Sequence, residues 1–174
     1  MHARNEKGSA VTVVVIAAAM VLLVILPVFA AIIEKFILLE KTEIIRSAVD
    51  MANISAYNAL NAGSLGKVTV NFDHAEMLDI FEELLSDNLR LDKDLEPEPG
   101  SIAEGQVVIS SLEIYCSGLP VRCPDDVLID RPSVHSCIDI PIKPSLYTGV
   151  ILKLLGKENI VIKVHVDSEI PINN

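Results

Sequence analysis

The first third of the chain carries two hydrophobic patterns, one after the other. Residues 9–33 contain no charged side chain. At about 1.5 Å per residue they make a helix of roughly 37 Å, enough to cross a hydrocarbon core of about 30 Å. Over residues 34–62 apolar side chains recur at helical spacing between polar ones, and no glycine interrupts them before Gly63. We therefore predict one helix that spans a membrane over 9–33 and continues as an amphipathic stalk over 34–62.

Other readings of this helix stay open. Val28, Phe29 and Ala30 place small residues where a signal peptidase could cut, so a cleaved signal peptide is one alternative and a fully buried core helix is another. Pro27 lies inside the apolar run and predicts a kink or local unwinding about two turns before the outer interface. The stalk needs a partner for its apolar stripe, either the protein's own globular domain or the same helix in neighbouring subunits.

Charges around the apolar run predict its orientation. His2, Arg4 and Lys7 precede the run, with only Glu6 against them. Because positive residues favour the cytoplasmic side, residues 1–8 are expected to form a cytoplasmic leader or stub, and the chain from Glu34 onward is expected outside. The predicted location is the cytoplasmic membrane, crossed once and contacting lipid.

The remainder, residues 63–174, is predicted to be an extracytoplasmic α+β domain. A turn at 61–66 and a short strand at 67–72 lead into an acidic helix over 73–91, with Asp73 as its N-cap, and an acidic, proline-containing loop follows over 92–106. Four later segments are rich in β-branched residues and predict strands: 107–115, 127–130, 137–143 and 159–167. Residues 147–155 fit a strand or a short helix. Without long crossover helices, the strands are expected to form an antiparallel sheet with one wet face.

The charge of the chain lies mostly in one place. Of the net charge of -10, residues 73–104 account for -9, with 11 acidic and 2 basic side chains. An acidic protein does not neutralise phosphates, so no nucleic-acid partner is expected. The acidic surface predicts a solvated face, and as an alternative function a membrane-tethered module that binds a basic partner. A calcium site is less favoured, because the Asp-x-Asp-x-Asp-Gly order of an EF-hand is missing.

Candidate chemistry is sparse. Cys116 and Cys123 flank a loop containing Gly118 and Pro120, and a disulfide between them is predicted on the outer side of the membrane. Cys137 is left over. A zinc site would have to recruit His135 and Cys137 with the first two cysteines, at spacings unlike common zinc motifs, so no metal and no cofactor are predicted. No hydrolase, protease, phosphate-loop or dinucleotide motif is present, and an enzyme is not expected.

The N-terminal sequence Glu6-Lys-Gly-Ser-Ala-Val-Thr-Val13, followed at once by the apolar helix, resembles type IV pilin-like proteins. The likeness is greatest to the TadE/TadG-like pseudopilins of tight-adherence (Flp) pilus systems. This resemblance implies a structural or assembly role in a bacterial pilus or secretion apparatus, with other pilin-like subunits as partners through the N-terminal helix. It also implies cleavage between Gly8 and Ser9. The pilin pattern has Glu five residues after the cut, where this chain has Val13, so an uncleaved single-span assembly protein is the alternative.

Overall fold

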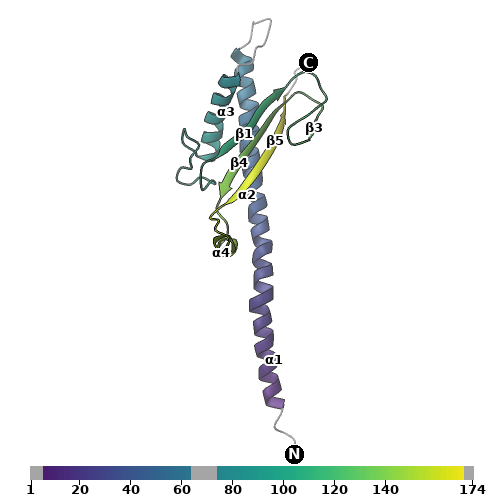
Figure 1. Ribbon diagram of the computed structural model, residues 1–174, viewed down its shortest axis with the longest axis vertical. Helices are drawn as coiled ribbons and strands as arrows, with labels where there is room; N and C mark the ends of the chain where they lie inside the picture. The colour runs from purple at the N-terminus through teal and green to yellow at the C-terminus, as the bar shows by residue number, and fades with distance from the viewer. Residues whose placement is uncertain (1–5, 64–73, 171–174) are drawn as a thin grey trace, which may run out of the picture.

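The structure is a computed structural model that describes residues 6–63 and 74–170. The expected strand at 67–72 and the expected N-cap at Asp73 lie outside the described residues. Figure 1 shows a long helical rod whose upper part carries a small domain and whose lower part stands alone. The predicted architecture, a long apolar N-terminal helix followed by a helix and an antiparallel sheet, is confirmed.

The rod consists of α1 (Glu6–Met20), a π-helical turn η1 (Val21–Ile25) and α2 (Leu26–Gly63). In the π turn the Leu26 N–H donates to the carbonyl of Val21, five residues back. Pro27 follows directly, and a proline has no N–H with which to satisfy the carbonyl of Leu23 in the preceding turn. The helix therefore unwinds locally next to Pro27, as the sequence predicts.

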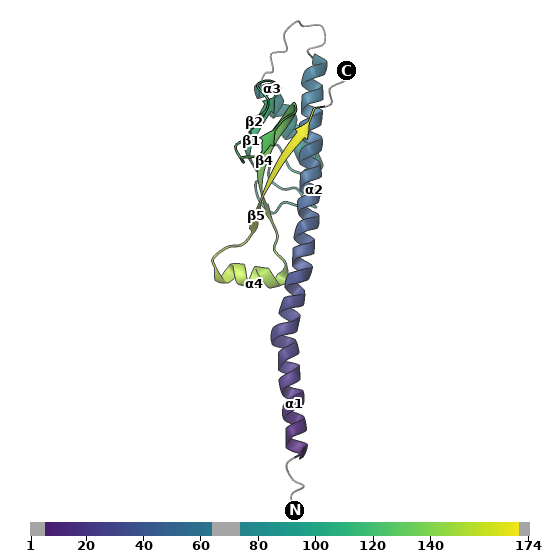
Figure 2. The same ribbon diagram turned by 90° about the vertical axis from the view of Figure 1, so that its right-hand side faces the viewer.

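In the described part of the domain that follows the rod, the first element is α3 (His74–Leu89), which packs along α2. Its central sheet has the order β1 (Val108–Tyr115), β4 (Ser133–Ile142) and β5 (Ile160–Glu169), with antiparallel neighbours. The structure begins β4 four residues before the predicted strand. The ambiguous segment at 147–155 is helical, as α4 (Leu146–Leu154). Figure 2 shows α4 at the lower end of the domain, extending sideways from the rod with one end against it.

The hydrophobic core lies between the upper part of α2, α3 and one face of the sheet. Phe81 of α3, Ile45 of α2 and Ile138 of β4 are completely buried there. Period-3.6 spacing on the helices and period-2 spacing on the strands bring these side chains to one layer. The upper stalk thus finds its partner in the protein's own domain, one of the two alternatives left open by the sequence. Other buried members of this core are Val49, Ala52, Ala56, Met77, Leu85, Ile140 and Ile142.

A buried polar contact fixes how α2 sits on the sheet. The Asn53 amide donates to the hydroxyl oxygens of Ser136 and Ser168, both at 2.9 Å. The Ser168 hydroxyl in turn donates to Asp50, one turn earlier on α2. Because a buried polar group is costly without its partners, this network favours one register of helix against sheet.

The face of the sheet that is turned away from α2 and α3 is not fully exposed to solvent. This corrects the prediction of one solvent-exposed face. Strand β4 is buried on both faces over Ser133–Ile138. The segment between β1 and β4 forms a small hairpin of β2 (Val121–Arg122) and β3 (Leu128–Ile129). A side chain of this hairpin, Cys123, lies beside the β5 residue His165 on the outer face of the sheet.

Candidate functional site

The lower half of the rod exposes an unbroken apolar surface. Across residues 10–33 every side chain is exposed except Pro27 and Ala30, which are partly covered. Leu23, near the middle, is 76% exposed. This helix is long and apolar enough to cross a membrane, and no part of its most apolar stretch is buried within the protein. A contiguous apolar surface of this size is covered by lipid or by other helices in a working protein.

Helix α4 is attached to the rod where this exposed surface ends. Glu34 of α2 is buried, and its carboxylate accepts a hydrogen bond from the Ser145 N–H at 3.1 Å and another from the Thr148 hydroxyl. Ser145 precedes α4 and its hydroxyl accepts the Thr148 N–H, so it caps the helix. The carboxylate therefore sits at the N-terminal end of α4, where the helix dipole favours a negative charge.

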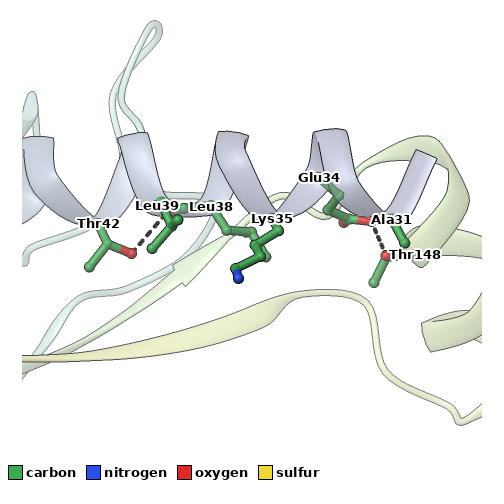
Figure 3. A pocket seen from close by; sticks show the side chains of 7 residues that line it. All are labelled: Ala31, Glu34, Lys35, Leu38, Leu39, Thr42 and Thr148. Atoms are coloured by element: carbon green, nitrogen blue, oxygen red, sulfur yellow. Dashed lines mark hydrogen bonds between the residues drawn. The ribbon is translucent and has the colours of Figure 1, made fainter. Parts of the chain in front are cut away.

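A cleft lies beside this contact, lined by α2 and by Thr148 of α4. In Figure 3 the Glu34 and Thr148 side chains point toward each other and close one end of the cleft. Its remaining lining comes from successive turns of α2: Ala31, Lys35, Leu38, Leu39 and Thr42. The cleft therefore combines the polar contact between Glu34 and Thr148 with the aliphatic side chains Ala31, Leu38 and Leu39.

The far side of α4 is apolar and uncovered. Val150 is 63% exposed and Leu154 83%, and these residues are four apart, on one face of the helix. Leu155 follows at 69% exposure. Exposed Lys153 and Lys157 stand beside them. An apolar face flanked by lysines is the pattern of a helix that lies in the surface of a membrane.

A second group of side chains lies under the β2–β3 hairpin, on the outer face of the sheet, which is the face turned away from α2 and α3. The group, which we call the Cys-His-His-Asp cluster, places four ligand-type atoms within 4.8 Å of one another. His135 of β4 lies opposite Asp167 of β5, and His165 is two residues from Asp167, so strand register sets all three on one face. The fourth member, Cys123, comes from the β2–β3 hairpin. The members are Cys123, His135, His165 and Asp167.

Distances within the cluster are short. His135 Nδ1 lies 2.8 Å from one oxygen of Asp167, and His165 Nε2 lies 2.9 Å from the other. The two ring nitrogens are 3.2 Å apart. Cys123 Sγ is 3.8 Å from His165 Nε2. His135 is completely buried and Cys123 is 4% exposed, whereas the edge of the cluster at β5 reaches solvent.

Neighbouring groups hold the cluster in place. The remaining nitrogen of His135, Nε2, lies 3.1 Å from the Ser111 hydroxyl on β1. The hairpin is tied to the sheet by an ion pair between Asp125 and Lys163 at 3.0 Å. The hydrogen bond from Lys163 lowers the pKa of the Asp125 carboxyl, and the same bond raises the pKa of the lysine. Burial raises the pKa of Tyr115, whose ring packs edge-on against His135.

The cysteines are arranged differently from the prediction. Cys116, Cys123 and Cys137 are all free thiols, so the expected bridge between Cys116 and Cys123 is not formed. Cys116 is exposed, whereas Cys123 turns onto the sheet beside His165. Burial raises the pKa of the Cys137 thiol.

The zinc ligand set that the sequence analysis weighed and did not favour shares two members, Cys123 and His135, with this cluster. Cys116 and Cys137 are not in the Cys-His-His-Asp cluster, and His165 and Asp167 were missed. Their spacing on a predicted strand was the available signal, because residues two apart on a strand face the same side. The candidate processing residues Gly8 and Ser9 lie within α1.

The acidic surface predicted from the sequence is present on α3 and the loop after it. Asp79, Glu82 and Asp87 line a shallow exposed cleft with Asp92 and Glu98. Asp92 caps its own turn by accepting the N–H groups of Asp94 and Glu96. The geometry is that of a solvated acidic face.

Comparisons with protein-family models, with curated proteins and with solved structures found no significant match.

Proposed function

We propose that this protein is a membrane-anchored, pilin-like structural or assembly component of a bacterial pilus or secretion apparatus. Its N-terminal stub lies in the cytoplasm and its α+β domain outside, following the positive-inside rule. A long helix that leaves its lower half bare and packs its upper half against a small sheet is consistent with a pilin-like fold. The observation that carries the proposal is this bare lower half, which the rest of the protein leaves uncovered.

The place where helix α4 meets the rod supports a membrane boundary near Glu34. The helix meets the rod at Glu34, the first charged residue after the apolar run, and its Val150 and Leu154 side chains are exposed. Figures 1 and 2 place α4 at the foot of the domain, between the sheet and the free-standing rod. We infer that α4 rests on the outer lipid surface, with its lysines near the headgroups.

Association with other helices is the second part of the proposal. Ala17, Ala18 and Ala19 give the rod a stretch of small side chains, and small residues let helices approach closely within a bilayer. Pilin-like or pilus-assembly subunits would pack along this surface. Ala31, which lines the cleft beside α4, extends the small-residue surface toward the membrane boundary.

The N-terminus of the mature protein tests the proposal. Intact-mass analysis is made on washed membranes and on material sheared from the cell surface. A chain that starts at Ser9 in the sheared fraction supports a filament subunit, and a chain that starts at Met1 in membranes only supports an assembly component. A chain that starts at Ala31 would remove the anchor and overturn the proposal. A Gly8→Leu variant is the control for cleavage, because prepilin-type processing in the resembling families follows glycine.

The clustering of acidic side chains on α3 favours a second candidate, a tethered module that binds a basic partner. Its probe is a lysine-rich peptide, with binding measured at two salt concentrations on the full chain in detergent micelles. Attraction of this kind weakens steeply in salt. Absence of binding at low salt would remove this candidate. A variant with Glu82→Lys and Glu83→Lys should lose the binding, while an exposed control, Glu113→Lys on β1, should keep it.

A further inference from the structure

We propose that Cys123, His135, His165 and Asp167 bind one zinc ion that fastens the β2–β3 hairpin to the outer face of the sheet. The site does not depend on the pilin-like assignment, because it lies wholly within the outer domain.

Hydrogen bonds account for only part of the close contacts among the four ligand atoms. His165 Nε2 has three neighbours, the Cys123 sulfur, His135 Nδ1 and an Asp167 oxygen. A ring nitrogen carries at most one proton, so a hydrogen bond can serve only one of these neighbours. His135 Nδ1 likewise faces both an Asp167 oxygen and the other imidazole. Several lone pairs directed at one point are the arrangement that a cation satisfies.

Two of the spacings in the cluster are close to those of a tetrahedral zinc site. Bonds of about 2.0 Å to nitrogen or oxygen and about 2.3 Å to sulfur place neighbouring ligand atoms about 3.3 Å apart, or about 3.5 Å where one is sulfur. The two imidazole nitrogens are 3.2 Å apart, and the sulfur is 3.8 Å from His165 Nε2. The two oxygens of Asp167 lie 2.8 Å and 2.9 Å from one imidazole nitrogen each, slightly closer than a tetrahedral edge. The whole set of four atoms lies within 4.8 Å, so a bound ion would draw them closer together.

The ligand types favour zinc over the commoner hard cations. One thiolate, two imidazoles and one carboxylate suit zinc, whereas calcium and magnesium take oxygen ligands. A thiolate and a carboxylate together balance the two charges of the ion, so the filled site is neutral. Neutrality matters because His135 and Cys123 are buried, and an unbalanced charge there would be costly.

The surroundings also fit a metal site. The Ser111 hydroxyl engages His135 Nε2 at 3.1 Å, which leaves Nδ1 directed into the cluster. Such outer contacts commonly orient metal-binding imidazoles. His165 and Asp167 also line a groove between α2 and β5, which gives an ion a path from solvent. Four protein ligands leave no open position, so the site is structural rather than catalytic.

The experiment measures zinc in the full-length chain in detergent micelles, purified without a histidine tag. After incubation with zinc and exhaustive dialysis, we expect about one zinc per chain by mass spectrometry of the metal. His165→Ala and Cys123→Ser should retain none. The matched controls His74→Gln and Cys116→Ser change the same residue types outside the cluster and should retain the full amount. Ser111→Ala should weaken zinc binding by about 10- to 100-fold.

Cobalt substitution keeps the proposal testable if a ligand variant does not fold. The wild-type chain loaded with cobalt should show the intense visible bands of tetrahedral coordination and a thiolate-to-cobalt charge-transfer band. Cys116→Ser should retain that charge-transfer band. Zinc that leaves wild-type protein on dialysis, equal zinc in the Cys123→Ser chain, or a cobalt spectrum without the thiolate band would each overturn the proposal. None of these results bears on where the mature chain begins, so the two proposals fail separately.

Discussion

The two halves of the long helix are both helical, apart from the π turn in the lower half, and have opposite surroundings. Over residues 10–33, the exposed segment, the helix is apolar all round and stands alone. Over residues 45–56, the covered segment, it buries Ile45, Val49 and Ala52 against the domain, while Met51 on the other side is 56% exposed. A helix that is apolar all round needs an apolar solvent, whereas a helix with a single apolar stripe needs a single partner. Each half of the rod therefore indicates its environment by how its apolar residues are distributed around it.

The largest difference between the two parts of the helix is expected when charged side chains are introduced. A double variant, Leu22→Arg with Leu23→Arg, puts two charges in the middle of the exposed segment and should cost about 5 to 7 kcal/mol of membrane insertion, about twice the value for one arginine. The control is Ile44→Arg with Met51→Arg, at exposed positions of the upper helix. The measurement is the fraction of chains that resists alkaline extraction from membranes. Equal fractions for the two double variants would contradict a spanning role for residues 9–33.

Replacing a phenylalanine by alanine should have the opposite order of effects, with a large loss of stability in the domain and almost none in the exposed segment. Phe81 of α3 is completely buried against the covered segment, and Phe81→Ala should lower the free energy of unfolding by about 3 to 5 kcal/mol. Phe29→Ala, at a position 60% exposed on the exposed segment, should change it by less than about 0.5 kcal/mol. Urea unfolding of the domain in micelles measures both. A similar loss from the two variants would mean that the lower helix takes part in the core.

The sequence predicted the rod well because its signals are local. An uncharged run of membrane length and a helical recurrence up to Gly63 both lie in consecutive residues, and the described part of α2 reaches Gly63. Pro27 marks the place where the winding changes, for the same local reason. Which partner covers the stalk could not be decided, because Ile45 and Ile138 are far apart in the sequence and meet only through the tertiary fold.

The polar network under the covered segment gives a smaller expected effect. Asn53→Ala removes the donor to Ser136 and Ser168 inside the core and should cost about 1 to 3 kcal/mol of stability, because two buried hydroxyl groups lose a partner. Asn58→Ala, on an exposed position of the same helix, should stay within about 0.5 kcal/mol. Thermal unfolding in micelles distinguishes them. An equal shift in both variants would show that the network does not hold the register of α2 on the sheet.

The Cys-His-His-Asp cluster was harder to predict than the fold because it depends on register. His135 meets Asp167 only because β4 and β5 pair with α4 inserted between them, and a shift of one strand by one residue would place the two side chains on opposite faces of the sheet. Cys123 directly follows β2, which at two residues is too short to give a pattern, although the other strand of the hairpin, β3, lies within the strand predicted at 127–130. The sequence did contain His165 and Asp167 at strand spacing, but a pair becomes a site only when other segments supply the remaining ligands.

The weakest effect concerns the boundary between the two segments, where α4 is expected to touch lipid. The chain has no tryptophan, so Leu154→Trp introduces a single fluorescent reporter on the exposed face of α4. In vesicles its emission should shift to shorter wavelength and be quenched by lipids with brominated acyl chains, because the apolar face of an interfacial helix lies at the acyl boundary.

Leu128→Trp is the matched reporter, at a position 58% exposed. It lies on β3, the short strand labelled in the upper part of the domain in Figure 1. Its emission should stay that of an aqueous indole and resist the brominated lipids. Quenching of both reporters would mean that the whole domain lies on the membrane. Quenching of neither would place α4 above the lipid, and the boundary of the exposed segment would then be set by the rod alone.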